Sequence, residues 1–300
     1  MKQFIFRSID SLLIRISATH RSRSSIFHAT CIRCSILLKY MLANALFDIL
    51  NIGNFTRLKK ARNTKSQIEA LVLGNGPSLA KISFPKVKNL QKMGLEVFVV
   101  NYFPLFENTE NITPNYLVLS DSGTRPSNKE ERSGRLWNWI RENESVTLCV
   151  PYSWKREVEI ITENVIYFND SGVEGIFQNI NPIFPRSYAS LTAYKALSLS
   201  LYFGYNKISI LGIDNSNYRN LLFTANNDVL QQPFHFGPYG TTVNFTQTLG
   251  MNASRYFLDL AQILEDLEMF KSDKLVNLDC ESVIDSFKKF ADYRFLNEDN

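Results

Sequence analysis

The chain has 300 residues, of which 45% are hydrophobic and 13% aromatic, and it contains no internal repeat or low-complexity tract. This length and composition allow one large or two modest globular domains. The net charge of +4 is unevenly spread: residues 1–68 hold 12 of the 33 Lys and Arg and 2 of the 29 Asp and Glu, which leaves 21 basic and 27 acidic residues in the remainder. A basic arm on an acidic body predicts an anionic surface as the partner of the arm.

The four cysteines, Cys31, Cys34, Cys149 and Cys280, do not form a disulfide framework, which favours a reducing compartment. Cys149 lies in an apolar, strand-like run and is expected to be a small core residue. Cys31 and Cys34 form a Cys-x-x-Cys pair with His28 three residues earlier. No second pair completes a zinc site, and no strand–helix unit precedes the pair as in a redox motif. The pattern therefore does not favour a metal or redox role.

The first 68 residues alternate basic and apolar side chains and resemble no enzyme core. The run from Cys34 to Ile52 is mostly apolar, but Lys39 and Asp48 interrupt it, so it falls short of an uncharged membrane-spanning stretch. A basic amphipathic helical segment that lies on an anionic leaflet fits better. An organelle transit peptide and a helical hairpin that packs on the body are the alternatives. The segment ends in a predicted polar linker: Lys59, Lys60, Arg62, Asn63, Thr64, Lys65 and Ser66.

From residue 69 the sequence predicts short strands that alternate with helices. The strands are apolar throughout, as expected for strands covered on both faces. The alternation predicts an α/β fold with a doubly wound, mostly parallel sheet. Strands are predicted at 69–74, 96–100, 115–119, 146–150, 165–168, 207–211 and 274–278, and helices at 84–93, 132–143, 190–203 and 252–270. The region of about 215–245 has no clear periodicity, and we predict an irregular lid there.

The first predicted strand opens into the turn Gly74-Asn75-Gly76-Pro77-Ser78. Gly74 and Gly76 have no Cβ to block a close approach, and free backbone N–H groups there can point at a phosphate. Asn75 and Ser78 add hydrogen-bonding side chains. A turn of this composition also forms without any ligand, so a plain turn is the alternative.

Small or polar residues also follow three other predicted strands. Because ligands of doubly wound sheets bind beyond the carboxyl ends of the strands, four such ends together favour a pocket. Each of these residues taken singly fits a cap or a turn. The residues are Asn101 after the second strand, Ser120 and Asp121 after the third, and Gly212, Ile213 and Asp214 after the strand at 207–211.

Two further features suggest binding or catalytic groups. Ser190 or Thr192 fits the start of the helix at 190–203, where a phosphate or carboxylate can bind, and Arg186 can pair with an anion. An ordinary N-cap beside a solvent-facing Arg is the alternative. His235 is the only histidine of the body, within the predicted lid. It suits a general base for a hydroxyl, with a packing role among aromatic residues as the alternative.

Several common catalytic motifs are missing from the sequence. It contains no Ser-His-Asp set, no Walker loop and no His-Glu-x-x-His motif. Leu79 stands where the third glycine of a Gly-x-Gly-x-x-Gly dinucleotide fingerprint belongs. No Asp-x-Asp metal clamp follows a strand, which disfavours a metal-dependent sugar transferase.

The Gly74–Leu79 motif, Asn101 and the segment 203–214, with Gly204-Tyr205 and Gly212-Ile213-Asp214, resemble the bacterial sialyltransferases of glycosyltransferase family 42. That family includes lipooligosaccharide enzymes of Campylobacter and Haemophilus. The resemblance is patchy and covers about residues 69–240. A wider set of look-alikes shares these motifs: lipopolysaccharide-core proteins, flagellin glycosylation factors and a pterin-pyrophosphokinase group.

The resemblance implies a Rossmann-like variant of the GT-A fold and a metal-independent inverting enzyme with no cofactor. Its donor would be a CMP-activated acidic sugar of eight or nine carbons. The family's Gly-Ile-Asp-Phe-Tyr pattern reads Gly212-Ile213-Asp214-Asn215-Ser216 here, so one tyrosine is missing. By this resemblance Asn75, Ser78 and Asn101 hold CMP, Asp121 replaces a substrate-contacting Asn, Ser190 or Thr192 binds the sugar carboxylate, Tyr218 stabilises the departing phosphate, and His235 is the base. Without a metal, a cationic donor such as Arg186 must help to stabilise that phosphate.

These observations together predict a peripheral glycosyltransferase on the inner, cytoplasmic face of a bacterial membrane. The expected partners are a glycan or lipid-linked glycan acceptor and an anionic membrane surface, with no nucleic acid. The family precedent suggests a homo-oligomer. The alternatives are a Mg²⁺- and ATP-dependent enzyme of the pterin-pyrophosphokinase type and a catalytically inactive nucleotide-binding assembly protein.

Overall fold

The computed structural model describes residues 52–106, 109, 112–170, 179–184, 191–215, 217–232, 243–244, 246–247 and 252–297. The basic arm up to residue 51, with Cys31 and Cys34, lies outside these ranges. A membrane-surface helical segment in residues 1–51 therefore stays a prediction.

The body is built on an eight-stranded sheet in which every neighbouring pair is parallel. The order is β11-β10-β6-β1-β2-β3-β4-β5. The chain thus adds strands outward from β1 to β5, returns, and continues with β6 on the other side of β1. This is the doubly wound α/β fold that the sequence predicts. The strands are β1 Glu69–Leu73, β2 Glu96–Val100, β3 Tyr116–Val118, β4 Thr147–Pro151, β5 Val165–Phe168, β6 Lys207–Leu211, β10 Leu275–Asn277 and β11 Lys288–Lys289.

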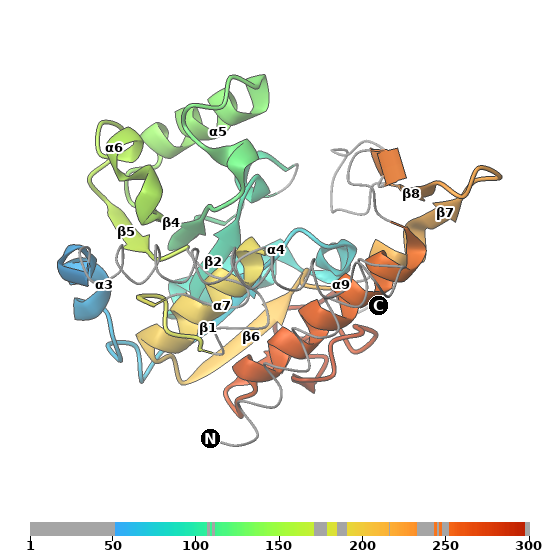
Figure 1. Ribbon diagram of the computed structural model, residues 1–300. Coiled ribbons are helices and arrows are strands. Elements are labelled where there is room, and N and C mark those ends of the chain that lie inside the picture. Colours follow the sequence, from blue (N-terminus) through green and yellow to red (C-terminus); the bar gives the residue numbers. More distant parts are fainter. Residues whose placement is uncertain are drawn as a thin grey trace, which may run out of the picture.

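Helices cover both faces of this sheet (Figure 1). The predicted helices are confirmed within three residues at their ends, whereas α3 and α6 are short and were not predicted. The α-helices are α3 Thr56–Lys60, α4 Phe84–Lys92, α5 Glu131–Glu142, α6 Lys155–Val158, α7 Thr192–Phe203 and α9 Ala253–Leu267, and the short 3-10 turns used below are η2 Pro77–Lys81, η5 Ser122–Thr124 and η7 Asn217–Asn220.

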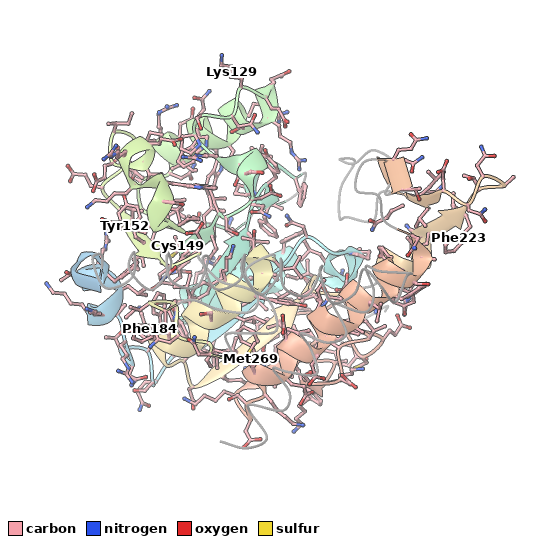
Figure 2. All side chains as sticks on the ribbon, viewed as in Figure 1. Lys129, Cys149, Tyr152, Phe184, Phe223 and Met269 are labelled. Carbon is pink, nitrogen blue, oxygen red and sulfur yellow. The ribbon has the colours of Figure 1, made fainter. Side chains whose placement is uncertain are left out.

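The two faces form two separate cores. On β1, Ala70 and Val72 point into a core shared with α7 and the end of α9, while Leu71 and Leu73 point into a core shared with α4 and α5. Successive side chains of a strand alternate between faces, so a strand with both faces covered is apolar throughout. Cys149 on β4 is fully buried in the first core, as predicted (Figure 2).

The packed body begins before residue 69, the domain boundary that is predicted from the sequence. Leu58 of α3 is buried in the first core. Within the predicted linker, the backbone N–H of Asn63 donates to Tyr202 O at 3.1 Å and that of Lys65 donates to Phe203 O at 3.0 Å. The polar composition of this segment reflects its solvent-facing side chains, while its backbone is fixed to the end of α7.

The predicted irregular lid contains regular structure. Strands β7 Leu221–Phe223, β8 Val229–Gln231 and β9 Val243–Asn244 form a small antiparallel sheet, so the prediction of an irregular segment is wrong for these residues. Strands of two or three residues are too short to give a periodic pattern. The β7–β8 pair stands away from the main sheet, with Phe223 exposed at its end (Figures 1 and 2). Residues 233–242, with His235, lie outside the described ranges.

No helix in the described part of the chain is long and apolar enough to cross a membrane.

Candidate functional site

A cavity of about 170 Å³ lies where the strand order changes direction, between the carboxyl ends of β1, β2 and β6 and the start of α7. Ligands of open α/β sheets bind at this switch point. We call this cavity the cleft. It is lined by Asn75, Gly76, Pro77, Val100, Asn101, Leu191, Thr192, Ala193, Tyr194, Gly212, Ile213, Asp214 and Asn215. The cleft thus brings together predicted residues from three strand ends and from the helix start.

The two glycines of the first turn allow β1 and β6 to interlock. A Cβ on Gly74 would lie 2.1 Å from the carbonyl oxygen of Gly212, and a Cβ on Gly76 would lie 2.3 Å from Asp214 Oδ2. The N–H of Gly74 donates to Leu211 O and that of Gly76 donates to Gly212 O, both at 2.8 Å. Contrary to expectation, neither N–H is free to bind a phosphate. The glycines are needed for contact with the β6 loop.

Ser78 and Asp214 hold the same two loops together. The N–H of Ser78 donates to Asp214 Oδ2 at 2.9 Å, its hydroxyl donates to Asp214 Oδ1, and that hydroxyl accepts from the N–H of Gly212 at 2.9 Å. Both side chains are buried. Burial raises the pKa of Asp214, and the hydrogen bonds from Ser78 oppose this shift only in part. The sequence predicts substrate binding for these two residues. In the structure their hydrogen bonds are with each other and with Gly212, and they fix the loops after β1 and β6.

Two asparagine side chains in the cleft carry unpaired acceptors. Asn75 Nδ2 donates to Val100 O at 3.3 Å, which fixes the orientation of the amide. Asn75 Oδ1 and Asn101 Oδ1 are both buried and have no hydrogen-bond partner in the described part of the chain. Leaving a buried acceptor unsatisfied costs about 1–3 kcal/mol, so such atoms in a cavity wall indicate where a ligand would donate hydrogen bonds.

Asn101 and Asn215 both adopt left-handed backbone conformations, with φ of 49° for each. Asparagine tolerates this conformation better than most residues. Asn215 Nδ2 donates to the hydroxyl of Tyr194, which joins the loop after β6 to α7 across the cleft. Tyr194 and Asn215 are not among the site residues predicted from the sequence, where Asn215 stands out only as a departure from a family pattern. The signal available for Asn215 is its place four residues after the end of β6, in the stretch Gly212-Ile213-Asp214-Asn215.

The start of α7 forms another wall of the cleft. Thr192 Oγ1 lies 2.7 Å from Ser120 Oγ, and this hydrogen bond links the end of β3 to the helix. In the described part of the chain the N-cap residue Leu191 makes no side-chain capping bond. Because Leu191, Thr192 and Ala193 all line the cleft, the positive end of the α7 dipole faces it. An anionic group of a ligand would be stabilised there.

Not every predicted site residue lies at the cleft. Asp121 is exposed and accepts a hydrogen bond from the N–H of Gly123 at 2.9 Å, so it caps the turn η5 and does not line the cleft. Tyr218, in η7, does not line it either, and its hydroxyl accepts from Arg219 Nε at 3.4 Å.

The remaining predicted residues, Arg186, Ser190 and His235, lie outside the described residues.

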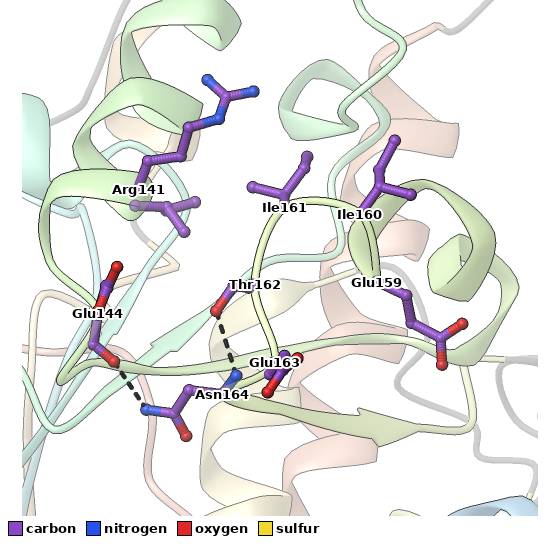
Figure 3. Close-up of a pocket in the computed structure, with 9 residues that line it drawn as sticks. Arg141, Glu144, Glu159, Ile160, Ile161, Thr162, Glu163 and Asn164 are labelled. Atoms are coloured by element: carbon purple, nitrogen blue, oxygen red, sulfur yellow. Dashed lines mark hydrogen bonds between the residues drawn. The ribbon is translucent and has the colours of Figure 1, made fainter.

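A larger cavity, of about 650 Å³, lies between the end of α5 and the segment before β5 (Figure 3). Asn164 Nδ2 donates to Glu144 O at 3.1 Å and closes one side of it. No predicted site residue lines this cavity, and it lies at the amino ends of β4 and β5, opposite the edge where such sheets bind ligands. Its lining residues are Ile140, Arg141, Glu144, Glu159, Ile160, Ile161, Thr162, Glu163 and Asn164.

The fold and the cleft define a doubly wound α/β protein with a candidate ligand site at the switch point of its sheet. No protein-family model matches the chain, and no curated protein matches it in sequence. Among solved structures, it is similar to the structure of MAf glycosyltransferase from Magnetospirillum magneticum AMB-1, with 13% identity and a TM-score of 0.47. The match covers 79% of this chain and 37% of that chain, so this chain spans well under two thirds of that protein.

Proposed function

We propose that the chain is a metal-independent inverting glycosyltransferase. It would move sialic acid or a related acidic sugar, Kdo-like or nonulosonic, from a CMP donor to a surface-glycan acceptor. The observation that carries this proposal is that Asn75 Oδ1 and Asn101 Oδ1, in a cleft at the switch point of the sheet, have no hydrogen-bond partner among the described residues.

The cleft has two chemically different ends. The two asparagine oxygens can only accept, so the part of the ligand beside them must donate, as the amino group of cytosine or the hydroxyls of ribose do. Phosphate and carboxylate oxygens accept, and the start of α7 with Thr192 suits them. A nucleoside monophosphate joined to an acidic sugar has both kinds of group within one molecule.

The reaction requires charge stabilisation and one proton transfer. The acceptor oxygen forms a bond to the anomeric carbon while the bond from that carbon to the phosphate oxygen breaks, and the bonding electrons leave with CMP. The acceptor proton passes to a base, for which we propose His235. The α7 dipole and Thr192 would stabilise the departing phosphate from the cleft. Tyr218, by the family resemblance, and Arg186, as a cationic donor in a site without a metal, are proposed to assist.

The proposed setting follows from the charge of the chain. The 12 Lys and Arg of residues 1–68 support attachment to an anionic membrane surface, where a lipid-linked glycan acceptor would lie. We propose a peripheral position on the inner face of the bacterial cytoplasmic membrane and a homo-oligomeric state, with no resident cofactor.

A thermal-shift panel with CMP, UDP, GDP and ATP tests the nucleotide assignment. A ligand at 100 times its Kd that binds only the folded state adds about 2.7 kcal/mol to the unfolding free energy. We expect CMP to give the largest shift, with or without chelator. A larger shift by ATP that needs Mg²⁺ would instead indicate an enzyme of the pyrophosphokinase type. No shift by any nucleotide would refute the assignment of the cleft to a nucleotide, and a CMP shift without glycosyl transfer would indicate the inactive nucleotide-binding assembly protein.

Two variants test whether CMP binds in the cleft. Asn75→Ala and Asn101→Ala each remove one acceptor, so each should raise the Kd for CMP by roughly 2- to 10-fold. Asn138→Ala is the matched control, because Asn138 is exposed on α5, far along the chain from the cleft residues. If Asn75→Ala and Asn101→Ala bind CMP as tightly as the wild type and the control do, the assignment of the nucleotide to these asparagines is refuted.

A further inference from the structure

A second cavity, of about 180 Å³, adjoins the cleft on the other side of the first turn. It shares Pro77 and Asp214 with the cleft, so these two residues form the wall between the two spaces. We call it the adjoining cavity. Its other lining residues are Ser78, Lys81, Arg219, Asp279, Glu281 and Ser282. They come from η2, η7 and the loop after β10, at the same carboxyl edge of the sheet as the cleft.

The adjoining cavity has no excess of basic side chains over acidic ones. Lys81 Nζ lies 2.9 Å from Asp279 Oδ1 and 3.1 Å from Glu281 Oε2. Burial lowers the pKa of Lys81, but its hydrogen bonds to both carboxylates outweigh this and leave the pKa raised, so Lys81 stays a cation. Arg219 adds a second cation, and its Nη2 donates to Glu281 O at 3.4 Å. Asp214 is a third acidic side chain of the lining, so two cations face three acidic side chains and give no net positive charge to attract a phosphate or a carboxylate ligand.

The loop that carries the carboxylates is held in place. Asn277 Oδ1 accepts from the N–H of Asp279 at 3.1 Å, and Asp279 Oδ1 accepts from the N–H of Glu281 at 3.2 Å. Lys289 Nζ donates to Ser282 O at 2.6 Å. Groups fixed before a ligand arrives lose less entropy on binding.

The polar atoms of the adjoining cavity that make no hydrogen bond within the described residues are suited to bind hydroxyl groups. In the described part of the chain, Asp279 Oδ2, Glu281 Oε1 and Arg219 Nη1 make no hydrogen bond. The carboxylate oxygens accept and the guanidinium nitrogen donates. A hydroxyl group does both, so neighbouring hydroxyls of a sugar ring can satisfy all three groups, whereas an anion can satisfy only the arginine.

We propose that the adjoining cavity is the subsite for the acceptor and binds the hydroxyls of a neutral saccharide. The assignment as acceptor subsite rests on the proposed function. Because the two cavities share Pro77 and Asp214, an acceptor held in the adjoining cavity would lie next to a donor in the cleft. The substrate class that follows is an uncharged terminal sugar, and a phosphorylated acceptor terminus is disfavoured.

Saccharide binding is measured directly, by saturation-transfer NMR on the full chain without nucleotide. The probes are methyl galactoside, methyl glucoside and methyl N-acetylglucosaminide at about 10 mM, which largely occupies a millimolar site. The test variant combines Arg219→Gln with Glu281→Gln, two exposed side chains whose replacement leaves the buried core intact. The control is Glu163→Gln, an exposed carboxylate of the other, larger cavity.

We expect at least one glycoside to bind the wild type and the control, and its affinity to fall about tenfold in the double variant, because hydrogen bonds to charged groups are lost. Inorganic phosphate should not displace the glycoside. The proposal is overturned if no glycoside binds the wild type, if the double variant binds equally well, or if phosphate competes. The CMP melting shift of the wild type separates the two proposals. If the wild type binds no glycoside but shows a CMP shift, the subsite alone is refuted, and if it binds a glycoside but shows no CMP shift, the proposed function is refuted.

Discussion

Replacing Gly74 by alanine tests the interlock of β1 and β6 on which the cleft depends. The new Cβ would lie 2.1 Å from the carbonyl oxygen and 2.7 Å from the carbonyl carbon of Gly212, and both are backbone atoms that no rotamer change can move. The two loops must separate by about 1.3 Å to bring the 2.1 Å approach to the 3.4 Å of an ordinary contact. That separation stretches the hydrogen bonds from Gly74 N to Leu211 O and from Gly76 N to Gly212 O, each now 2.8 Å.

The expected cost combines two effects. Overpacking costs about 1–3 kcal/mol, and each of the two weakened hydrogen bonds costs about 0.5–1.5 kcal/mol. We therefore expect Gly74→Ala to lower the unfolding free energy by about 3 kcal/mol, which corresponds to a fall in Tm of roughly 6–12 °C for a chain of this size. Urea denaturation followed by circular dichroism measures this change.

Gly134→Ala is the matched control. Gly134 lies within α5, and a Cβ there would meet no atom within 4 Å. Alanine is favoured over glycine in a helix interior, so this variant should be more stable by about 0.5–1 kcal/mol. The two variants make the same chemical change with opposite expected signs. If both shift the urea midpoint in the same direction, or if Gly74→Ala lies within about 0.5 kcal/mol of the wild type, the interlock is not what requires glycine at position 74.

Three further predictions follow from the site and its surroundings. Burial holds the pKa of Asp214 in the folded protein above its ordinary value of 3.8. The stability that the protonated carboxyl contributes is therefore fully present below pH 3.8, and it is lost as the pH rises through the pKa that Asp214 has in the folded protein. The unfolding free energy of the wild type minus that of Asp214→Asn should therefore fall from about pH 4 to about pH 7, and a rise would contradict this reasoning. The hydrogen bond from Arg125 is the main cause that keeps the pKa of Glu157 below its ordinary value. An NMR titration of Arg125→Gln should show a higher pKa for Glu157, and an unchanged value would exclude this cause. His235→Ala should abolish glycosyl transfer, measured as acceptor-dependent release of CMP, and should leave the CMP melting shift intact, whereas unchanged turnover would refute its role as the base.

Local patterns in the sequence are enough to predict the architecture. Seven apolar runs of strand length became the seven strands from β1 to β6 and β10, because a strand buried on both faces needs apolar side chains at every position. The helices between them follow from periodic apolar residues that meet the same two cores. The sequence also indicated which residues stand at the strand ends, since the end of an apolar run is a local property. Asn75, Asn101, Gly212 and Asp214 do line one cleft.

The roles of those residues depend on contacts between segments that are distant in the sequence. Gly76 and Ser78 read as ligand-binding residues from the sequence, yet their contacts are with the β6 loop, and the Ser78–Asp214 pair joins residues 136 positions apart. Asp121 follows β3 as predicted but caps its own turn, and the structure assigns a wall of the cleft to Tyr194, a residue that no local pattern marks. Local sequence sets the backbone propensity of each segment, whereas a hydrogen-bond partner is chosen by which distant segments the fold brings within about 3 Å.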